Sequence, residues 1–185
     1  MELHTSRLRI DALHDGDVAA LFAYRGDAEV VRYQGWRPQS LAEAAAFIER
    51  QRGVVPGVCG HWQQFALRLR GDDTLIGDLG LHVVDDATVE FGITLAPAWQ
   101  GRGLAGEAMR AMLALAFERM GKHRAIASVD PRNHACVRML ERIGMRKEAH
   151  FRESLRWGDG WADDAIYAML AREWASHRAA THDRG

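Results

Sequence analysis

The chain has 185 residues, of which 48% are hydrophobic and 26% charged, so it can bury the core of one domain. Its 24 lysines and arginines balance 25 aspartates and glutamates, and the net charge of −1 argues against a nucleic-acid coat or a membrane-seeking surface. The longest apolar run in a helical context, AMLALAF at 111–117, is too short to cross a bilayer, and the N-terminal MELHTSRLRI has no apolar signal core. We therefore expect a cytoplasmic protein.

Cysteine and histidine usage argues against a disulfide framework and a metal centre. Cys59 and Cys136 are the two cysteines, and the nine histidines are scattered without the spacing of metal ligands. We therefore expect no structural disulfide and no bound metal.

The predicted elements begin with one strand and two helices. Leu8–Ile10 alternates as a short strand does, and a helix follows whose apolar positions are Val18, Leu21 and Phe22. Ser40 and Glu43 have the spacing of a capping box, in which each side chain accepts from the other's backbone N–H. They predict a helix that ends near Gly53, before a loop over 53–60.

Three strands joined by tight turns follow. The segments 62–70, 74–84 and 88–97 alternate apolar and polar residues, and short runs of glycine and aspartate separate them. Consecutive strands joined in this way form an antiparallel meander.

The hydrophobic period then becomes helical, and Gly121 ends the helix. Its apolar residues recur at i, i+3, i+4, i+7, i+8 and i+11, and they are Met109, Met112, Leu113, Ala116, Phe117 and Met120. After it we predict a buried strand over 125–129 and a helix that Asn133 caps and Gly144 stops.

The last predicted element is a hairpin of strands 148–157 and 164–170, joined by a glycine-rich turn. Residues 171–185 are polar, and we expect a frayed tail there. The sequence therefore predicts one mixed α/β domain over 1–170.

The stretch GRGLAG at 101–106 has the letters of the dinucleotide-binding fingerprint, G-x-G-x-x-G. That fingerprint needs a strand that runs into its first glycine within a parallel βαβ unit, whereas residues 96–100 and an antiparallel meander precede Gly101. No Gly-Lys-Ser/Thr follows, which excludes a P-loop. What remains is the shared physics, because glycines let the backbone approach an anion and a helix N-terminus presents free N–H groups to it.

The form Gln100-x-x-Gly103-x-Ala105, between a strand and a long helix, resembles the pyrophosphate loop Q/R-x-x-G-x-G/A of the GCN5-related N-acetyltransferases (GNAT). In order along the chain, four segments also resemble the ribosomal-protein N-acetyltransferase (RimJ/RimL)-like branch of that superfamily: 27–48, 75–81, 90–109 and 129–145. The resemblance covers the chain to about residue 170.

This resemblance implies a single GNAT-like domain of the α/β (α+β) class. The expected central sheet is mixed, has about seven strands with the first four antiparallel, and is flanked by helices. The strands at 88–95 and 125–129 would run parallel and diverge, with the pantetheine arm of acetyl-CoA between them.

The resemblance also implies the coenzyme contacts. Backbone groups of the diverging strand would bind the pantetheine amides, as an added strand would, the glycine turn would bind the pyrophosphate, and Asn133 would contact the pantetheine. For Asn133 a plain helix cap is the alternative, and it can serve both roles. The predicted coenzyme-binding residues are Ile93, Thr94, Leu95, Gln100, Gly101, Arg102, Gly103, Leu104, Ala105 and Asn133.

Glu90 is the leading candidate for the catalytic base. It lies on the strand where many members of the superfamily place a catalytic carboxylate, and its neighbours Phe91 and Ile93 would desolvate it and raise its pKa. The alternative is a carboxylate at a strand edge in a solvated or structural hydrogen bond.

Cys136 is the second catalytic candidate, because the branch often carries a serine there, in N-x-x-S, that contacts or protonates the coenzyme sulfur. A thiol can do the same, and packing as a small apolar residue is the alternative. Leu155 and Arg156 stand where the best-known members have a glutamate base, which leaves a ribosomal-protein substrate open.

The acceptor pocket is expected in the variable segments, where the candidates are Tyr33, Trp36, His61 and Trp62. Asp159, Asp163 and Asp164 around the final hairpin would attract a cationic acceptor, or simply form a solvated turn. Glu107, in the first turn of the long helix, suits the helix dipole and is expected to be structural.

The predicted function is that of an acetyl-CoA-dependent N-acetyltransferase with direct attack in a ternary complex, without a metal. The acceptor is a protein N-terminal α-amine or a small-molecule amine such as an antibiotic or polyamine. A non-catalytic acyl-CoA-binding or regulatory module is the alternative, and a dinucleotide-dependent oxidoreductase the third hypothesis. By resemblance a homodimer is also expected, although no heptad pattern demands it.

Overall fold

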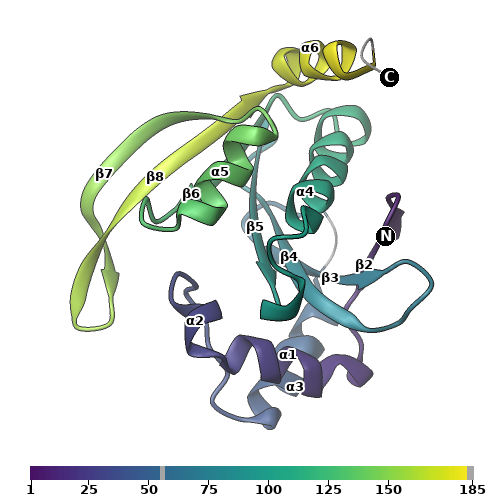
Figure 1. The fold of residues 1–185 in the computed structure, drawn as a ribbon, viewed down its shortest axis with the longest axis vertical. Helices are drawn as coiled ribbons and strands as arrows, with labels where there is room; N and C mark the ends of the chain where they lie inside the picture. Colours follow the sequence, from purple (N-terminus) through teal and green to yellow (C-terminus); the bar gives the residue numbers. More distant parts are fainter. Residues whose placement is uncertain (55–56, 183–185) are drawn as a thin grey trace.

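The computed structural model describes residues 1–54 and 57–182, which form one mixed β-sheet with helices on both faces (Figure 1). Two residues of the loop predicted at 53–60 thus lie outside the described residues. The strands are β1 (Leu3–His4), β2 (Leu8–Ala12), β3 (Trp62–Leu69), β4 (Leu75–Val83), β5 (Thr88–Leu95), β6 (Arg124–Val129), β7 (Arg146–Trp157) and β8 (Gly160–Leu170). The α-helices are α1 (Val18–Gly26), α2 (Ala28–Val31), α3 (Leu41–Arg52), α4 (Leu104–Ala114), α5 (His134–Arg142) and α6 (Ala171–His182).

The sheet has the order β1-β2-β3-β4-β5-β6-β8-β7. Strands β1 to β5 pair antiparallel with their neighbours, β5 and β6 pair parallel, and β8 pairs antiparallel with both β6 and β7. The predicted mixed sheet with an antiparallel N-terminal part is confirmed. The strand beyond the expected seven is β1, whose two residues are too few to show an alternating pattern.

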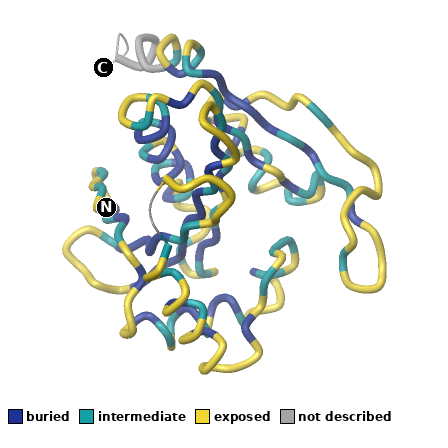
Figure 2. The backbone as a smooth tube through the Cα atoms, turned by 180° about the vertical axis from the view of Figure 1, so that it is seen from behind, coloured by how far each residue is buried: buried dark blue, intermediate teal, exposed yellow. Residues whose placement is uncertain are grey.

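Each face of the sheet carries its own hydrophobic core. Along β3, Phe65 and Leu67 pack into the larger core with residues of α4 and α5, whereas Ala66 between them packs into the smaller core with α1 and α3. Neighbouring strand residues point to opposite faces, so this alternation places α4 and α5 on one face and α1 and α3 on the other. Figure 2 shows the buried strands between the two helical layers.

Helix α3 begins where its capping signal predicts, but with a different bond. Ser40 Oγ accepts from the backbone N–H of Glu43 at 3.2 Å, as expected. The Glu43 carboxylate accepts from the N–H of Gln39 at 2.8 Å and not from that of Ser40, so the capping box closes one residue further out.

The long predicted helix is α4 followed by a turn of π-helix at Leu115–Arg119. In this turn the N–H of Met120 reaches back to the carbonyl of Leu115 at 2.9 Å, an i→i+5 bond. The chain then leaves through Gly121, whose φ is 65°. The sequence period predicted the helix and its end but not the wider turn.

The C-terminal tail differs from the expected frayed segment. Residues 171–182 form α6, whose Trp174 side chain is buried against the larger core and donates from Nε1 to Glu118 at 2.8 Å. The buried indole and the ion pair between Glu173 and Arg146 dock this helix, although its other residues are mostly polar.

The hairpin of β7 and β8 projects beyond the rest of the sheet (Figure 1). Its register shifts between Phe151 and Leu155, where Glu153 has a φ of 48°, so β7 carries a bulge. Most of β7 is exposed. Among the described residues, no helix combines the length and apolar character that a membrane span requires.

Candidate functional site

The sheet opens between β5 and β6. Their parallel pairing covers Thr88–Arg124, Val89–Ala125 and Glu90–Ile126, and it stops there although β5 continues to Leu95 and β6 to Val129. We call the unpaired gap beyond these pairs the split, and the Glu90–Ile126 pair its apex. The split is the divergence of parallel strands that the sequence predicted.

The register of β5 shows which backbone groups face the split. Ala96 N–H donates to Ile76 at 2.9 Å, so the backbone of residue 96 points toward β4. Because backbone direction alternates along a strand, Thr94 also points its backbone toward β4, whereas Ile93 and Leu95 point theirs toward the split. The three predicted pantetheine contacts are therefore not equivalent, because the backbone of Thr94 faces β4 and not the split. The Oγ1 of Thr94 is buried and has no hydrogen-bond partner within the described residues.

Two glycines shape the turn that leads into α4. Gly101 and Gly103 have φ values of 72° and 76°, a left-handed conformation that side chains with a Cβ rarely adopt. Gly103 is the N-cap of α4, and no side chain caps that helix end. The first N–H groups of α4 are therefore available to an anion, and the helix dipole adds partial positive charge.

The remaining residues of the turn support it or border it. Gln100 donates from Nε2 to the carbonyl of Leu95 at 2.9 Å, which ties the turn to the end of β5. The Arg102 guanidinium lies over the ring of Trp99, 4.9 Å from its centroid, and stays exposed. Leu104 is buried in the larger core, so its contribution is its backbone, and Ala105 is half-buried.

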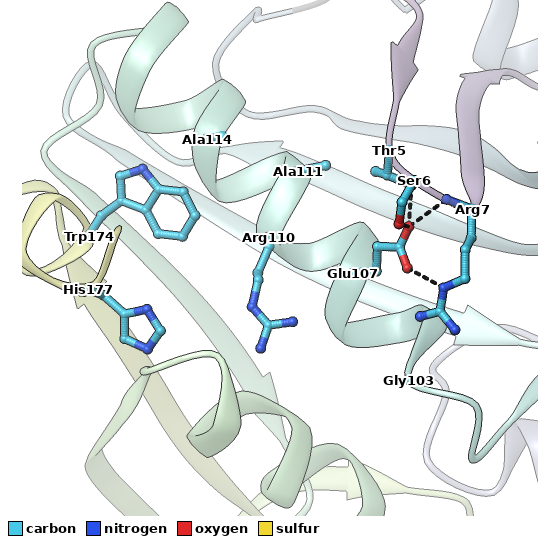
Figure 3. A pocket seen from close by; sticks show the side chains of 10 residues that line it. All are labelled: Thr5, Ser6, Arg7, Gly103, Glu107, Arg110, Ala111, Ala114, Trp174 and His177. Carbon is cyan, nitrogen blue, oxygen red and sulfur yellow. Dashed lines mark hydrogen bonds and ion pairs between the residues drawn. The ribbon is translucent and has the colours of Figure 1, made fainter. Parts of the chain in front are cut away.

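Glu107 holds α4 against the N-terminal strands (Figure 3). Its carboxylate accepts from Thr5 Oγ1 at 2.6 Å, Ser6 Oγ at 2.9 Å, and Arg7 N and Nε at 2.8 and 2.6 Å. Burial opposes ionisation of this carboxyl, but the hydrogen bonds from Thr5, Arg7 and Ser6 outweigh it and lower its pKa to about 2. The expected structural role of Glu107 agrees with this geometry.

A pocket of about 520 Å³ lies beside this cluster, lined by the turn at Gly103, the outer side of α4, and Trp174 and His177 of α6 (Figure 3). Its lining includes Arg110 but no residue of the split. It therefore adjoins the glycine turn and lies away from the apex.

Helix α5, which follows β6 in the chain, carries two predicted residues at its start. Asn133 is its N-cap and accepts at Oδ1 from the N–H of Cys136 at 3.2 Å, so its capping role is observed. The Cys136 side chain packs against the larger core, and burial raises the pKa of its thiol to about 11. The thiol therefore stays protonated at neutral pH and is available as a hydrogen-bond donor.

Glu90 stands in a row of side chains across three strands. The register pairs it with His82 on β4, and His82 with Trp62 on β3. His82 Nδ1 lies 3.4 Å from Glu90 Oε2, and the His82 and Trp62 rings stack with centroids 5.1 Å apart. His82 therefore lies between Trp62 and Glu90 and contacts both. His82 was not among the residues predicted from the sequence.

The length of the hairpin loop decides which residue faces His82. The loop spans Asp85–Ala87, so positions 82 and 90, each four residues from Asp86, lie opposite each other. The two-residue turn predicted at Asp85–Asp86 would instead have placed Val89 opposite His82. A histidine at that position is a titratable neighbour for a candidate base.

The other acceptor-pocket candidates differ in their neighbours. Tyr33 Oη donates to the carbonyl of Arg132 at 3.4 Å, so the segment after α2 reaches the loop that follows β6. Trp36 stacks on Phe47 at 4.3 Å and packs against the smaller core. His61 is exposed.

The aspartates of the final hairpin differ in their surroundings. Asp164 accepts from Ser128 Oγ on β6 at 2.6 Å, and Asp163 is bonded to His150 at 2.7 Å and to the backbone of Glu153 at 2.9 Å. Asp159 is exposed in the turn. Leu155 and Arg156 have no carboxylate, so neither can replace the glutamate base of the best-known members. Leu155 is 40% exposed, and the Arg156 guanidinium lies over the ring of Trp161.

A charged cluster anchors α1 beside this site. Asp78 of β4 is fully buried and accepts from Tyr24 Oη at 2.6 Å, Arg25 Nε at 3.1 Å, Arg25 Nη2 at 2.5 Å and Gln64 Nε2 at 2.8 Å. Sequence reasoning missed this cluster, because isolated charged residues in a helix and a strand carry no mark of their pairing. Within the described residues, no group of three His, Cys, Asp or Glu side chains is placed to hold a metal.

Parallel strands that separate beside a glycine turn and an uncapped helix N-terminus define an acyltransferase of the GNAT type. The chain belongs to that family: residues 7–146 match the acetyltransferase (GNAT) domain. Its enzyme class is accordingly N-acetyltransferase.

The similar proteins agree with this membership. The uncharacterized N-acetyltransferase YnaD of Bacillus subtilis (strain 168) is 32% identical over 175 residues, which are 94% of this chain and 99% of YnaD. The ribosomal protein uS5-alanine N-acetyltransferase of Escherichia coli (strain K12) is 29% identical over 88 residues, 48% of this chain and 45% of its own. Relatives thus include ribosomal-protein N-acetyltransferases, over a shorter stretch.

Solved structures show the same fold. A GNAT-family acetyltransferase from Bacillus anthracis superposes with a TM-score of 0.85 at 29% identity, covering 93% of this chain and 99% of that one. The spermidine N-acetyltransferase from Vibrio cholerae, in complex with CoA and spermine, has a TM-score of 0.79 at 21% identity, covering 92% and 99%.

Proposed function

We propose that this protein transfers the acetyl group of acetyl-CoA to a primary amine, by direct attack of the amine on the thioester in a ternary complex. The observation that carries the proposal is the end of β5–β6 pairing at Glu90–Ile126, followed along the chain by the glycine turn and the uncapped start of α4. The split suits an extended amide chain and the turn suits a diphosphate.

The groups around the split fit a pantetheine arm. Ile93 and Leu95 offer unpaired backbone positions at its edge, and Gln100 already satisfies the Leu95 carbonyl, which leaves the Leu95 N–H. A Cβ added to Gly101 would meet no atom within 4 Å, so the turn is open there. Gly101 to Ala105 would then hold the diphosphate, with Arg102 at its rim and Asn133 across the split.

The reaction requires a neutral, deprotonated amine as the nucleophile and a proton for the departing thiolate. Glu90 at the apex is the proposed carboxylate of the base, and Cys136, protonated at neutral pH, is proposed to donate a hydrogen bond to the coenzyme sulfur. An α-amine ordinarily titrates near pH 8 and a lysine near pH 10.4, so an α-amine needs the weaker base.

The acceptor belongs to one of two classes. The relative from Escherichia coli is named for a protein N-terminal alanine, and the Vibrio cholerae structure for spermidine. Trp62 and Tyr33 are the proposed walls of the acceptor pocket here, and the carboxylates of Glu90 and Asp164 favour a cationic amine of either class.

The test is release of free thiol from acetyl-CoA with a panel of N-terminal peptides and of small amines. We expect turnover with members of one class and none without an acceptor. Tight coenzyme binding without turnover on any member would favour a non-catalytic acyl-CoA-binding module. Binding of NAD(P) but not of coenzyme A would contradict the assignment of the glycine turn.

A further inference from the structure

His82 lies at the centre of the row that crosses the apex of the split. The register places Trp62, His82, Glu90 and Ile126 side by side on β3, β4, β5 and β6. Side chains at directly paired positions share one face of a sheet. Glu90 is therefore paired with His82 on one side and with Ile126 on the other, and the Glu90–Ile126 pair is the last one before the split opens.

The imidazole is held from two sides. On the β3 side the Trp62 ring stacks on it with an interplanar angle of 21°. On the β5 side its Nδ1 lies 3.4 Å from Glu90 Oε2. Within the described residues, Nε2 has no hydrogen-bond partner, and the His82 side chain remains 21% exposed.

Two glycines lie on this face beside the pair, and the one on β4 makes room for the Trp62 ring. Gly80 and Gly92 are opposite each other on β4 and β5, each two positions from His82 or Glu90 on the same face. A Cβ on Gly80 would lie 2.9 Å from Trp62 Cε3 and 2.5 Å from Gln64 Oε1, so the Trp62 indole lies directly over this glycine. Gly92 is exposed, and the side chains of His82 and Glu90 are 21% and 22% exposed. An acceptor amine can therefore reach the pair from the side of Gly92.

We propose that the imidazole of His82 takes the proton from the acceptor ammonium, while Glu90 positions it through Nδ1 and stabilises the imidazolium. This inference rests on the proposed function and makes Glu90 act through His82. The arrangement is that of a base oriented by a carboxylate, in which the Nδ1–H donates to Glu90 and leaves Nε2 free to accept.

The step balances as follows. The ammonium R–NH₃⁺ gives one proton to His82 Nε2, and the neutral amine attacks the thioester carbonyl carbon, forming the C–N bond. The C–S bond then breaks, the thiolate leaves with its electron pair, and the amide nitrogen loses its second proton. One of these protons ends on the coenzyme thiol and the other in solvent, so the products are the acetamide, the thiol and one H⁺.

Few other charges act on His82. On β5 the group that faces it is Glu90, and on β3 Trp62 and Gln64 do not ionise. On β4 itself the nearest titratable side chain of this face is Asp78, whose charge is paired with Arg25. Glu90 is therefore the ionisable side chain that contacts His82 directly.

The test compares wild type, His82→Gln and Glu90→Gln with one acceptor, measuring kcat and KM against pH. We expect His82→Gln to lower kcat/KM for the acceptor about 100-fold or more and to remove the acid limb of the profile, with KM for acetyl-CoA within about twofold. Glu90→Gln should lower kcat less than His82→Gln does. A merely structural histidine would not remove the acid limb. His4→Gln is the matched control, because His4 forms an exposed pair with Glu2 at 2.7 Å on the sheet edge.

A second measurement needs no acceptor. Nitrogen-15 NMR of the ligand-free protein should show the neutral His82 ring protonated at Nδ1 in wild type, with a shifted tautomer balance in Glu90→Gln and His4 unchanged. An unchanged His82 tautomer would overturn the pairing. A wild-type pH profile in His82→Gln, or a greater loss in Glu90→Gln, would overturn His82 as proton acceptor. Absence of wild-type turnover on every acceptor would refute the proposed function, and the NMR comparison would still decide the pair.

Discussion

At the scale of single residues, the fold shifts the pKa values of Glu107 and Cys136 in opposite directions. Glu107 is surrounded by donors, and its pKa falls to about 2. Cys136 has an apolar environment, and burial raises its pKa to about 11. At neutral pH, Glu107 is therefore a charged carboxylate with a structural role. The Cys136 thiol stays neutral and can donate a hydrogen bond.

Glu107→Gln should destabilise the protein in a pH-dependent way. The folded pKa of about 2 lies below the ordinary 4.5, so the stabilisation is present above pH 4.5 and is lost as pH falls toward 2. We expect a loss on the order of 2–3 kcal/mol at pH 7 that shrinks by pH 2, measured by urea unfolding. Glu43→Gln, an exposed carboxylate with one backbone bond, is the control. An equal loss at both pH values would refute the electrostatic origin.

Cys136→Ala should lower kcat about tenfold, while Cys136→Ser stays within about threefold of wild type, because serine keeps a donor at that position. The coenzyme dissociation constant should change little in either variant. The measurement is steady-state kinetics with calorimetric binding of coenzyme A. Equal rates in wild type, Cys136→Ala and Cys136→Ser would show that Cys136 only packs against the core.

At the scale of elements, the glycine turn depends on backbone conformation more than on side chains. Gly101 and Gly103 both have positive φ, and α4 begins without a side-chain cap. A side-chain cap would occupy the N–H groups that an anion needs. The uncapped start of α4 and the left-handed glycines thus both suit the diphosphate ligand proposed for this turn.

Gly101→Ala and Gly71→Ala form a matched pair for this turn. Their φ values are 72° and 82°, and an added Cβ meets no atom within 4 Å at either position. Both variants should lose about 1–2 kcal/mol of stability from the backbone alone. We expect only Gly101→Ala to weaken coenzyme A binding, by about tenfold, measured by titration calorimetry. Equal affinities in the two variants would remove Gly101 from the coenzyme site.

At the scale of the whole molecule, the buried cluster around Asp78 joins the α1 layer to the sheet beside the split. Its carboxylate is fully satisfied by Tyr24, Arg25 and Gln64. Loss of one partner leaves a buried charge without compensation, which costs far more than loss of a surface pair.

Arg25→Met should therefore destabilise the protein by about 3–5 kcal/mol, whereas Arg52→Met, which removes pairs with the exposed Asp15 and Glu49, should cost much less. Urea denaturation at pH 7 measures both. Similar losses would show that burial of the Arg25–Asp78 pair carries no special weight.

Local signals determined the elements of this fold, because alternation, helical period and capping act within a few residues. They located the meander of β3 to β5, the start of α3 at Ser40 and the end of the long helix at Gly121. The order of the motifs indicated the family, and the residues of the glycine turn followed from it.

Tertiary structure decided which residues meet. The row from Trp62 through His82 to Glu90 depends on strand register, the Asp78 cluster on helix packing, and the docking of α6 on an indole and an ion pair. These contacts join residues far apart in the chain, or set on different strands, and no local pattern records such pairings. The sequence by itself therefore specified the coenzyme turn, whereas the proton-accepting pair proposed at the apex became visible only when three strands were placed in register.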